Sequence, residues 1–166
     1  PLKADGKRSI FRVHRDVRFA KDKSPYKTHC GAVMTRSGAK SDHGLLYIHI
    51  DPEGCFAVAG FYAPASPDLL KIRQAIAGTR GAYKRVETGL GKGRLSLSDA
   101  NQLTRVPRGF EELKGGKLDH AIRLKSFIVR EELSASAITS ADLVATISDF
   151  AGRAMPLLRF GWKALD

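Results

Sequence analysis

The sequence predicts an α+β fold, a mostly antiparallel sheet of four or five strands packed against helices, and two features carry this prediction. Apolar runs at 45–50 and 55–61 flank Asp-Pro-Glu-Gly at 51–54, where turn-forming residues occupy the positions that a type I turn prefers. Two later segments, 66–78 and 143–154, repeat apolar residues at helical spacing. A length of 166 residues with 43% hydrophobic content suits one domain over residues 1–166.

The N-terminal part of the chain alternates between apolar and polar residues, which predicts a strand over Ser9–Phe19. Its apolar face would carry Phe11, Val13, Val17 and Phe19. The segment 21–27 is typical of a turn, because Asp, Ser and Pro are turn formers. A strand at 30–35 and a polar loop at 37–44 are expected next.

The hairpin at 45–61 also predicts its own register. Its turn places Ile48 opposite Ala57 and projects Tyr47 and His49 from the other face. Because both faces are largely apolar, we expect the hairpin in the centre of the sheet.

Residues that cap or interrupt helices predict where the remaining elements begin and end. Ser66 caps a helix over 66–78, and Pro67 suits its first turn. The last helix opens in the manner of a capping box at 139–142, and Pro156 ends or kinks it. Between them we expect a short helix at 82–88, a flexible glycine-rich connection at 89–93, a helical turn at 98–103, a turn at 106–110 and a strand at 125–131.

The positive charge is concentrated near the N-terminus. The net charge is +11, and residues 1–40 hold eleven Lys and Arg against three Asp, which is +8 of that total. Such a regional excess favours an acidic partner, such as a nucleic acid, a nucleotide, a phospholipid surface or another polyanion. The alternative is a basic protein without a specific partner.

Cysteine content and hydropathy indicate the cellular environment in which the protein is expected. Cys30 and Cys55 are too few for a disulfide framework, which predicts a reducing, cytoplasmic environment. No apolar run approaches the ~20 residues that a membrane helix needs. We therefore expect no membrane partner, and the sequence leaves the oligomeric state open.

The stretch 15–29 is the predicted functional centre. Five of its fifteen residues are Lys or Arg and two are Asp. Guanidinium groups bind oxyanions with two parallel hydrogen bonds, and ammonium groups add point charge. The predicted anion-binding residues are Arg15, Arg18, Lys21, Lys23, Tyr26 and Lys27. Arg108 and Lys125 are also predicted to contribute if the fold places them beside this stretch.

The same stretch, Arg-Asp-Val-Arg-Phe-Ala-Lys-Asp-Lys-Ser-Pro-Tyr-Lys-Thr-His, resembles the signature of a conserved bacterial and fungal family, domain of unknown function 2461. It differs at Ala20, where the family more often has Ser. The segments 47–50, 70–76, 105–110 and 124–127 resemble the family in the same order, so the resemblance spans nearly the whole chain. Family members usually carry a further helical segment before the position of Pro1, and we expect this chain to lack it. The resemblance implies no particular reaction.

Catalytic and metal-binding signals are sparse. Asp16, His14 and His29 are the candidates for acid–base chemistry beside the basic stretch. The five histidines show no metal spacing such as His-x-x-x-His, so no metal and no cofactor is predicted, and a zinc site would require separated segments to converge. His49, on an apolar strand, is expected to be packed and hydrogen-bonded rather than a ligand.

Three functions remain open. The first is a domain that binds a phosphate-bearing or other acidic ligand, including nucleotides and nucleic acids. For nucleic acid, Phe19 and Tyr26 are the nearby aromatic residues on which bases would stack, unless the core takes them. The second is an enzyme that acts on a phosphate- or carboxylate-bearing substrate. The third is a structural or interaction protein whose arginines are paired internally.

Overall fold

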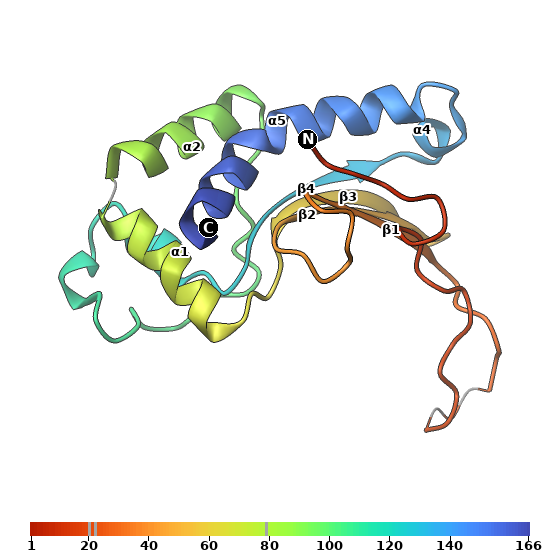
Figure 1. Cartoon of the computed structure of the whole chain (residues 1–166), viewed down its shortest axis with the longest axis horizontal. Helices are drawn as coiled ribbons and strands as arrows, with labels where there is room; N and C mark the ends of the chain where they lie inside the picture. The colour runs from red at the N-terminus through yellow and green to blue at the C-terminus, as the bar shows by residue number, and fades with distance from the viewer. Residues whose placement is uncertain (20, 22, 79) are drawn as a thin grey trace.

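The computed structural model has a four-stranded antiparallel sheet with helices packed on one face, which confirms the α+β prediction (Figure 1). It describes residues 1–19, 21, 23–78 and 80–166, the side chain of Arg80 excepted. Strand order follows the sequence: β1 (Cys30–Thr35), β2 (Leu45–Ile50), β3 (Cys55–Phe61) and β4 (Phe127–Leu133). The helices are α1 (Ser66–Gly78), α2 (Arg80–Lys92), the 3-10 turn η1 (Glu111–Leu113), α3 (Asp119–Arg123), α4 (Ala135–Thr139) and α5 (Leu143–Leu165).

The hairpin forms the centre of the sheet in the predicted register. Ile48 lies opposite Ala57 and Tyr47 opposite Val58, with β1 and β4 on the outside. Alternation along each strand then gives the sheet two different faces. The face under α5 belongs to the core and carries the buried residues Leu46, Ala57, Ala59, Phe61, Phe127 and Val129, while α1 and α2 pack against α5. The second face carries Tyr47, His49, Phe56 and Arg130, away from the helices.

Packing between α2 and α5 overrides the prediction made from the glycines at 89–93. The segment 89–93 is not a flexible connection, because α2 continues through it to Lys92 and buries Leu90. A Cβ atom at Gly89 would lie 2.9 Å from Cγ of Pro156, so glycine is what lets the two helices approach here. Pro156 lies inside α5 and does not end it, and the ribbon of α5 bends part-way along its length, which agrees with the second of the two outcomes predicted for this proline (Figure 1).

Two other predicted helical signals are also wrong. The segment 98–103 is not helical, because its backbone bonds to neighbouring chain: the amide of Ser98 donates to Ile128 O at 2.9 Å. The expected capping box at 139–142 does not form, since Asp142 at the N-cap of α5 makes no side-chain cap bond. Instead Oγ of Ser140 accepts a hydrogen bond from the amide of Asp142 at 3.0 Å.

Segments outside the four strands pair with both outer edges of the sheet. On β1, the amide of Val33 donates to Ser9 O at 2.9 Å, and the amide of Lys3 donates to Thr35 O at 2.7 Å. On β4, the bond from Ser98 to Ile128 occupies part of the opposite edge. Chain that is not itself a strand therefore satisfies backbone groups that an edge strand would otherwise expose.

The predicted strand Ser9–Phe19 does not form as one strand. Its first residues bond to the edge of β1, with the amide of Phe11 donating to Gly31 O at 2.9 Å. The chain then leaves the sheet and doubles back as a narrow ribbon, residues 12–28, which we call the arm (Figure 1). Backbone bonds across its described part run from the amide of Lys27 to Val13 O at 2.8 Å and from the amide of Arg15 to Pro25 O at 2.9 Å.

The apolar side of the arm lies in the open. Val13 and Phe19 are 46 and 96% exposed, whereas Phe11, which precedes the arm, is 38% exposed and contacts Tyr47 and Lys40. The alternation in the sequence is that of a strand, but the core that it would face is absent along the described part of the arm. The predicted turn lies at its far end, and both Ala20, the predicted departure from the family signature, and the predicted turn former Asp22 lie outside the described residues.

A buried arginine ties α1 to the chain that precedes β4. Nε of Arg73 donates to Ile122 O at 2.8 Å, and its Nη2 donates to Leu124 O at 2.9 Å. Burial lowers the pKa of Arg73 from its ordinary value, which reflects the cost of placing this charge among apolar neighbours. The two carbonyl bonds offset that cost and fix the position of the chain entering β4.

We predict that Arg73→Ala lowers the free energy of unfolding by about 3 kcal/mol, because it leaves two buried carbonyl groups without their charged donor. Arg73→Lys should recover less than half of the loss, since one ammonium group lacks the fork that reaches both oxygens. Urea unfolding monitored by circular dichroism measures both values. Gln74→Ala, an exposed neighbour on α1, is the control, and a loss for Arg73→Ala as small as the control's would contradict the prediction.

Candidate functional site

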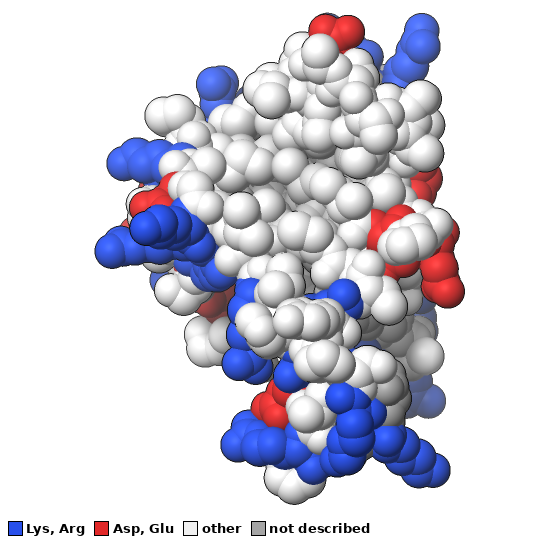
Figure 2. All heavy atoms as spheres, turned by 90° about the vertical axis from the view of Figure 1, so that its right-hand side faces the viewer, with Lys and Arg blue, Asp and Glu red and all other residues white. Residues whose placement is uncertain are grey.

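The arm gathers positive charge at one end of the molecule. Figure 2 shows lysine and arginine side chains crowded at the lower end of this face, over the arm, below a broad uncharged surface. The arm holds six cationic residues against two Asp in the sequence. The cations are Arg12, Arg15, Arg18, Lys21, Lys23 and Lys27, and all but the half-buried Lys27 are exposed.

Arg18 of the arm has its counter-charge within the chain. Arg18 binds Asp16 with two hydrogen bonds, from Nε to Oδ1 at 3.0 Å and from Nη2 to Oδ2 at 2.7 Å. This contact lowers the pKa of the Asp16 carboxyl and raises the pKa of Arg18. Lys23 also forms a hydrogen bond within the arm, since its Nζ donates to Val17 O at 3.0 Å. Asp16, predicted as an acid–base candidate, is therefore engaged as the partner of Arg18.

Aromatic side chains lie exposed among these cations. Phe19 is 96% exposed and Tyr26 is 60% exposed, so the core takes neither of them. His14, a predicted acid–base candidate, lies opposite Tyr26 across the ribbon, and the two ring centroids are 5.2 Å apart. Both ring systems are thus presented on the arm together with its charge.

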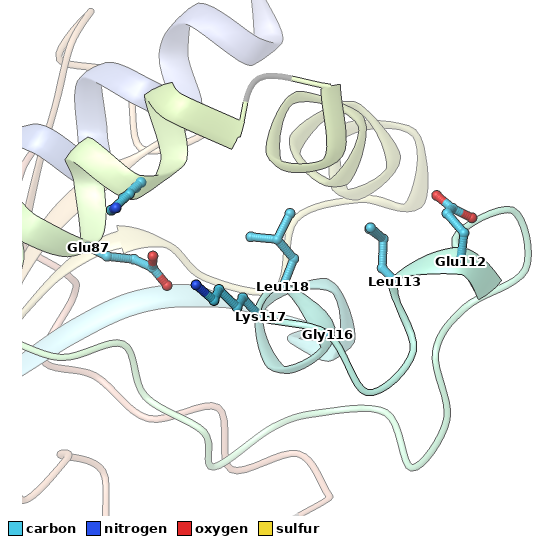
Figure 3. A pocket seen from close by; sticks show the side chains of 7 residues that line it. Glu87, Glu112, Leu113, Gly116, Lys117 and Leu118 are labelled. Carbon is cyan, nitrogen blue, oxygen red and sulfur yellow. The ribbon is translucent and has the colours of Figure 1, made fainter.

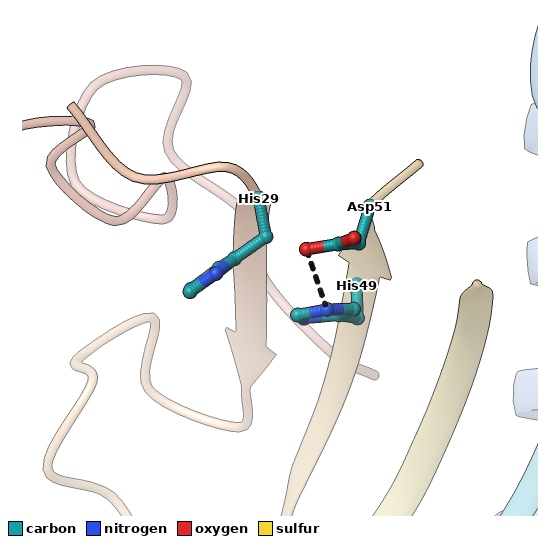
Figure 4. Close-up of side chains that lie close together, drawn as sticks. All are labelled: His29, His49 and Asp51. Carbon is teal, nitrogen blue, oxygen red and sulfur yellow. Dashed lines mark ion pairs between the residues drawn. The ribbon is translucent and has the colours of Figure 1, made fainter. Parts of the chain in front are cut away.

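At the base of the arm, His29 meets two residues of β2 and its turn. The side chains of His29, His49 and Asp51 extend to the same side of the sheet (Figure 4). One nitrogen or oxygen of each lies within 4.8 Å of the others, and Nε2 of His49 is 3.9 Å from Oδ2 of Asp51. We call these three residues the histidine–aspartate cluster. His29 is the only predicted site residue in it.

Neighbours on the second face of the sheet orient His49. The Tyr47 hydroxyl and Nδ1 of His49 are 3.0 Å apart, and the His49 ring stacks on Phe56 with centroids 4.6 Å apart. Burial lowers the pKa of His49, the nearby His29 lowers it further, and Asp51 opposes both effects. His49 is packed and hydrogen-bonded, as the sequence predicts.

Two hollows adjoin the cluster where the arm leaves the sheet, and both include Lys27 and His29. The smaller, of about 140 Å³, is also lined by Phe11, Arg12, Gly31 and Tyr47. The larger, of about 440 Å³, reaches Asp51 and continues to α4. The base of the arm therefore combines imidazole, carboxylate and cationic groups around accessible space.

The family of the chain can now be stated. Residues 2–160 match a family described as "Conserved hypothetical protein (DUF2461)". The chain belongs to this family. The description of DUF2461 names no activity, so membership supplies no reaction. No curated protein and no solved structure matches this member of the family. No helix among the described residues is both long and apolar enough to cross a membrane.

The structure does not bring Arg108 and Lys125 to the arm. The neighbouring elements η1 and α3 lie beside α1, at the opposite end from the arm (Figure 1). A separate hollow of about 360 Å³ lies at this end, and Glu87 and Lys117 extend toward each other in it (Figure 3). Its charged lining residues are two lysines and two glutamates, a balance that favours no anion.

Sequence reasoning missed His49 and Asp51 as members of the cluster. A usable signal was present, because His49 and Asp51 are two residues apart at the end of a strand and therefore share a face. The approach of His29 depends on the pairing of β1 with β2, in which Gly31 lies opposite His49. No local spacing encodes that approach.

We predict that Gly31→Ala destabilises the protein by about 1–2 kcal/mol, because the new methyl group would lie 2.6 Å from the Tyr47 hydroxyl oxygen and 2.9 Å from its ring. The Tyr47 side chain would therefore have to shift. In a Tyr47→Ala background the same substitution should cost under about 0.5 kcal/mol, since the obstructing side chain is gone. Chemical unfolding of the four proteins in this cycle measures the coupling, and equal costs in both backgrounds would contradict it.

Proposed function

We propose that this protein binds single-stranded nucleic acid through its arm. The observation that carries the proposal is the exposure of Phe19 and Tyr26 among the cations of a projecting ribbon. Proteins that bind single strands without sequence preference combine a positively charged track for the backbone with aromatic rings on which bases stack. Both components occur together on the arm.

The distribution of charge supports an extended ligand over a small one. The arm cations are spread along the ribbon, whereas a small anion is usually held by groups that converge in a pocket. The arm carries an excess of four positive charges in the sequence, and each phosphate neutralised releases counterions. Large exposed aromatic groups of this kind also gain favourable free energy when a partner covers them.

Particular contacts favour the two other functions. A small phosphate-bearing ligand or substrate would find Arg12, Lys27 and His29 around the smaller hollow at the base of the arm. Internal pairing of arginine is supported by the bond between Arg18 and Asp16, although this pair is exposed and solvent screens its charges. Tight binding of a mononucleotide with no gain from a longer strand would favour the small-ligand function over the proposed one.

We predict that Phe19→Ala with Tyr26→Ala weakens binding of a fluorescent 15-nucleotide single strand by about 10-fold or more, because stacking on an aromatic side chain contributes about 1–3 kcal/mol per base. The salt dependence should keep its slope, since no charge is removed. Fluorescence anisotropy with oligo-dT and oligo-rU gives both quantities. Phe19 is exposed, so thermal unfolding should stay near that of the wild type and show that the fold persists.

We expect the salt dependence of binding to change when lysine charge is removed and the aromatic residues are kept. Lys21→Gln with Lys23→Gln should flatten the plot of log affinity against log salt by roughly 0.7 per lysine. Lys84→Gln with Lys117→Gln removes the same charge from the far end of the molecule and should leave the slope unchanged. Equal effects of the two pairs would show that net charge, and not the arm, attracts the strand, and would overturn the proposal.

A further inference from the structure

We infer that the histidine–aspartate cluster is a binding site for a divalent transition-metal ion of the zinc class, with three protein ligands and a coordination position open to solvent. The ligands are His29, His49 and Asp51. The site is distinct from the nucleic-acid surface proposed for the arm and does not depend on it.

The backbone brings the three ligands together by strand pairing. His29 directly precedes β1, and Gly31 lies opposite His49 on β2, so the two histidines are neighbours across the ladder. Their ring centroids are 4.8 Å apart. Asp51 follows His49 by two residues and faces the same side (Figure 4).

The spacing of the donor atoms is close to that of a bound ion. Tetrahedral zinc with nitrogen and oxygen ligands near 2.0–2.1 Å needs these atoms about 3.3 Å apart. In the cluster they lie within 4.8 Å of one another, and Nε2 of His49 is 3.9 Å from Oδ2 of Asp51. Small side-chain rotations would close this gap. At 3.9 Å the imidazole and the carboxylate are too far apart for a direct hydrogen bond, so an ion would supply a contact that they do not make with each other.

The chemistry of the donors selects the ion. Two imidazoles and one carboxylate form the ligand set of catalytic zinc sites and of non-haem ferrous sites, and both leave at least one position open. Calcium and magnesium prefer sites made of oxygen ligands alone. The chain therefore offers a site for Zn²⁺ or Fe²⁺ rather than for Mg²⁺ or Ca²⁺.

Hydrogen bonds to neighbouring groups hold two of the ligands, His49 and Asp51, in place. The Tyr47 hydroxyl bonds Nδ1 of His49 at 3.0 Å, which leaves Nε2 for the ion. The Asp51 carboxylate accepts from the Thr28 hydroxyl at 3.3 Å and from the amide of Glu53 at 2.9 Å. Metal ligands in proteins commonly have such outer partners, and removal of one typically weakens metal binding by about 10- to 100-fold.

The open position faces accessible space. Both hollows at the base of the arm include His29, and the larger also includes Asp51. Lys27 lines the same two hollows and Arg12 lines the smaller. An anionic ligand in the open position would meet the ion on one side and these cations on the other.

The test is titration of the chelator-treated full chain with Co²⁺, whose visible absorption reports its ligands. Calorimetry with Zn²⁺ gives the affinity and the number of ions bound, and thermal unfolding with and without the ion gives the change in unfolding temperature. All proteins carry Cys30→Ser and Cys55→Ser, so that thiolates do not compete for the ion. We expect one ion per chain, a raised unfolding temperature and visible bands of nitrogen–oxygen coordination.

His29→Ala and Asp51→Asn should each weaken Co²⁺ binding at least about 10-fold, and Tyr47→Phe by about 10-fold. Asparagine keeps the oxygen that accepts the Glu53 amide, so Asp51→Asn preserves the turn. His120→Ala removes an exposed histidine elsewhere and should bind like the parent. A parent Kd weaker than about 1 mM, or unchanged binding in His29→Ala, would overturn the site. Unfolding in the presence of chelator shows whether each variant folds.

Discussion

The pairing of β2 with β3 determines where the side chains of the candidate site point. Leu46 is buried beneath the helices, so the intervening Tyr47 and His49 must face the other side of the sheet. A slip of one residue would exchange the two sets and place imidazole and phenol in the core. The turn that fixes this register uses Asp51, whose Oδ1 accepts the Glu53 amide, while its Oδ2 lies toward His49. One carboxylate thus serves both the fold and the cluster.

The two proposals concern adjacent parts of the molecule but depend on different physics. Binding by the arm would rest on charge and on exposed rings, so it would weaken steeply with salt. Metal binding at the cluster would rest on the number and geometry of donor atoms, which salt affects little. Lys27 and His29 line both hollows at the junction, so a ligand there would contact residues of both sites.

Much of the scaffold could be predicted from the sequence, because strong local signals agreed with the tertiary structure. The hairpin register and the helix from Ser66 follow from turn chemistry and periodicity. The strand Ser9–Phe19 failed because alternation shows which residues share a face but not whether a layer covers it. The segment at Gly89 failed because close packing against Pro156 outweighs the low helix propensity of glycine. His29 and Asp51 lie on separate segments, and only the ladder between β1 and β2 joins them.

The pairing of the sheet's outer edges with non-strand chain limits how this protein can associate. An unpaired edge would let an extended peptide, or a second molecule, add to the sheet through main-chain bonds and seed aggregation. Here Lys3 and Ser9 already bond to β1, and Ser98 bonds to β4. β-Augmentation is thereby disfavoured at both borders, and selectivity for any binding partner rests with protruding side chains, not with exposed peptide groups.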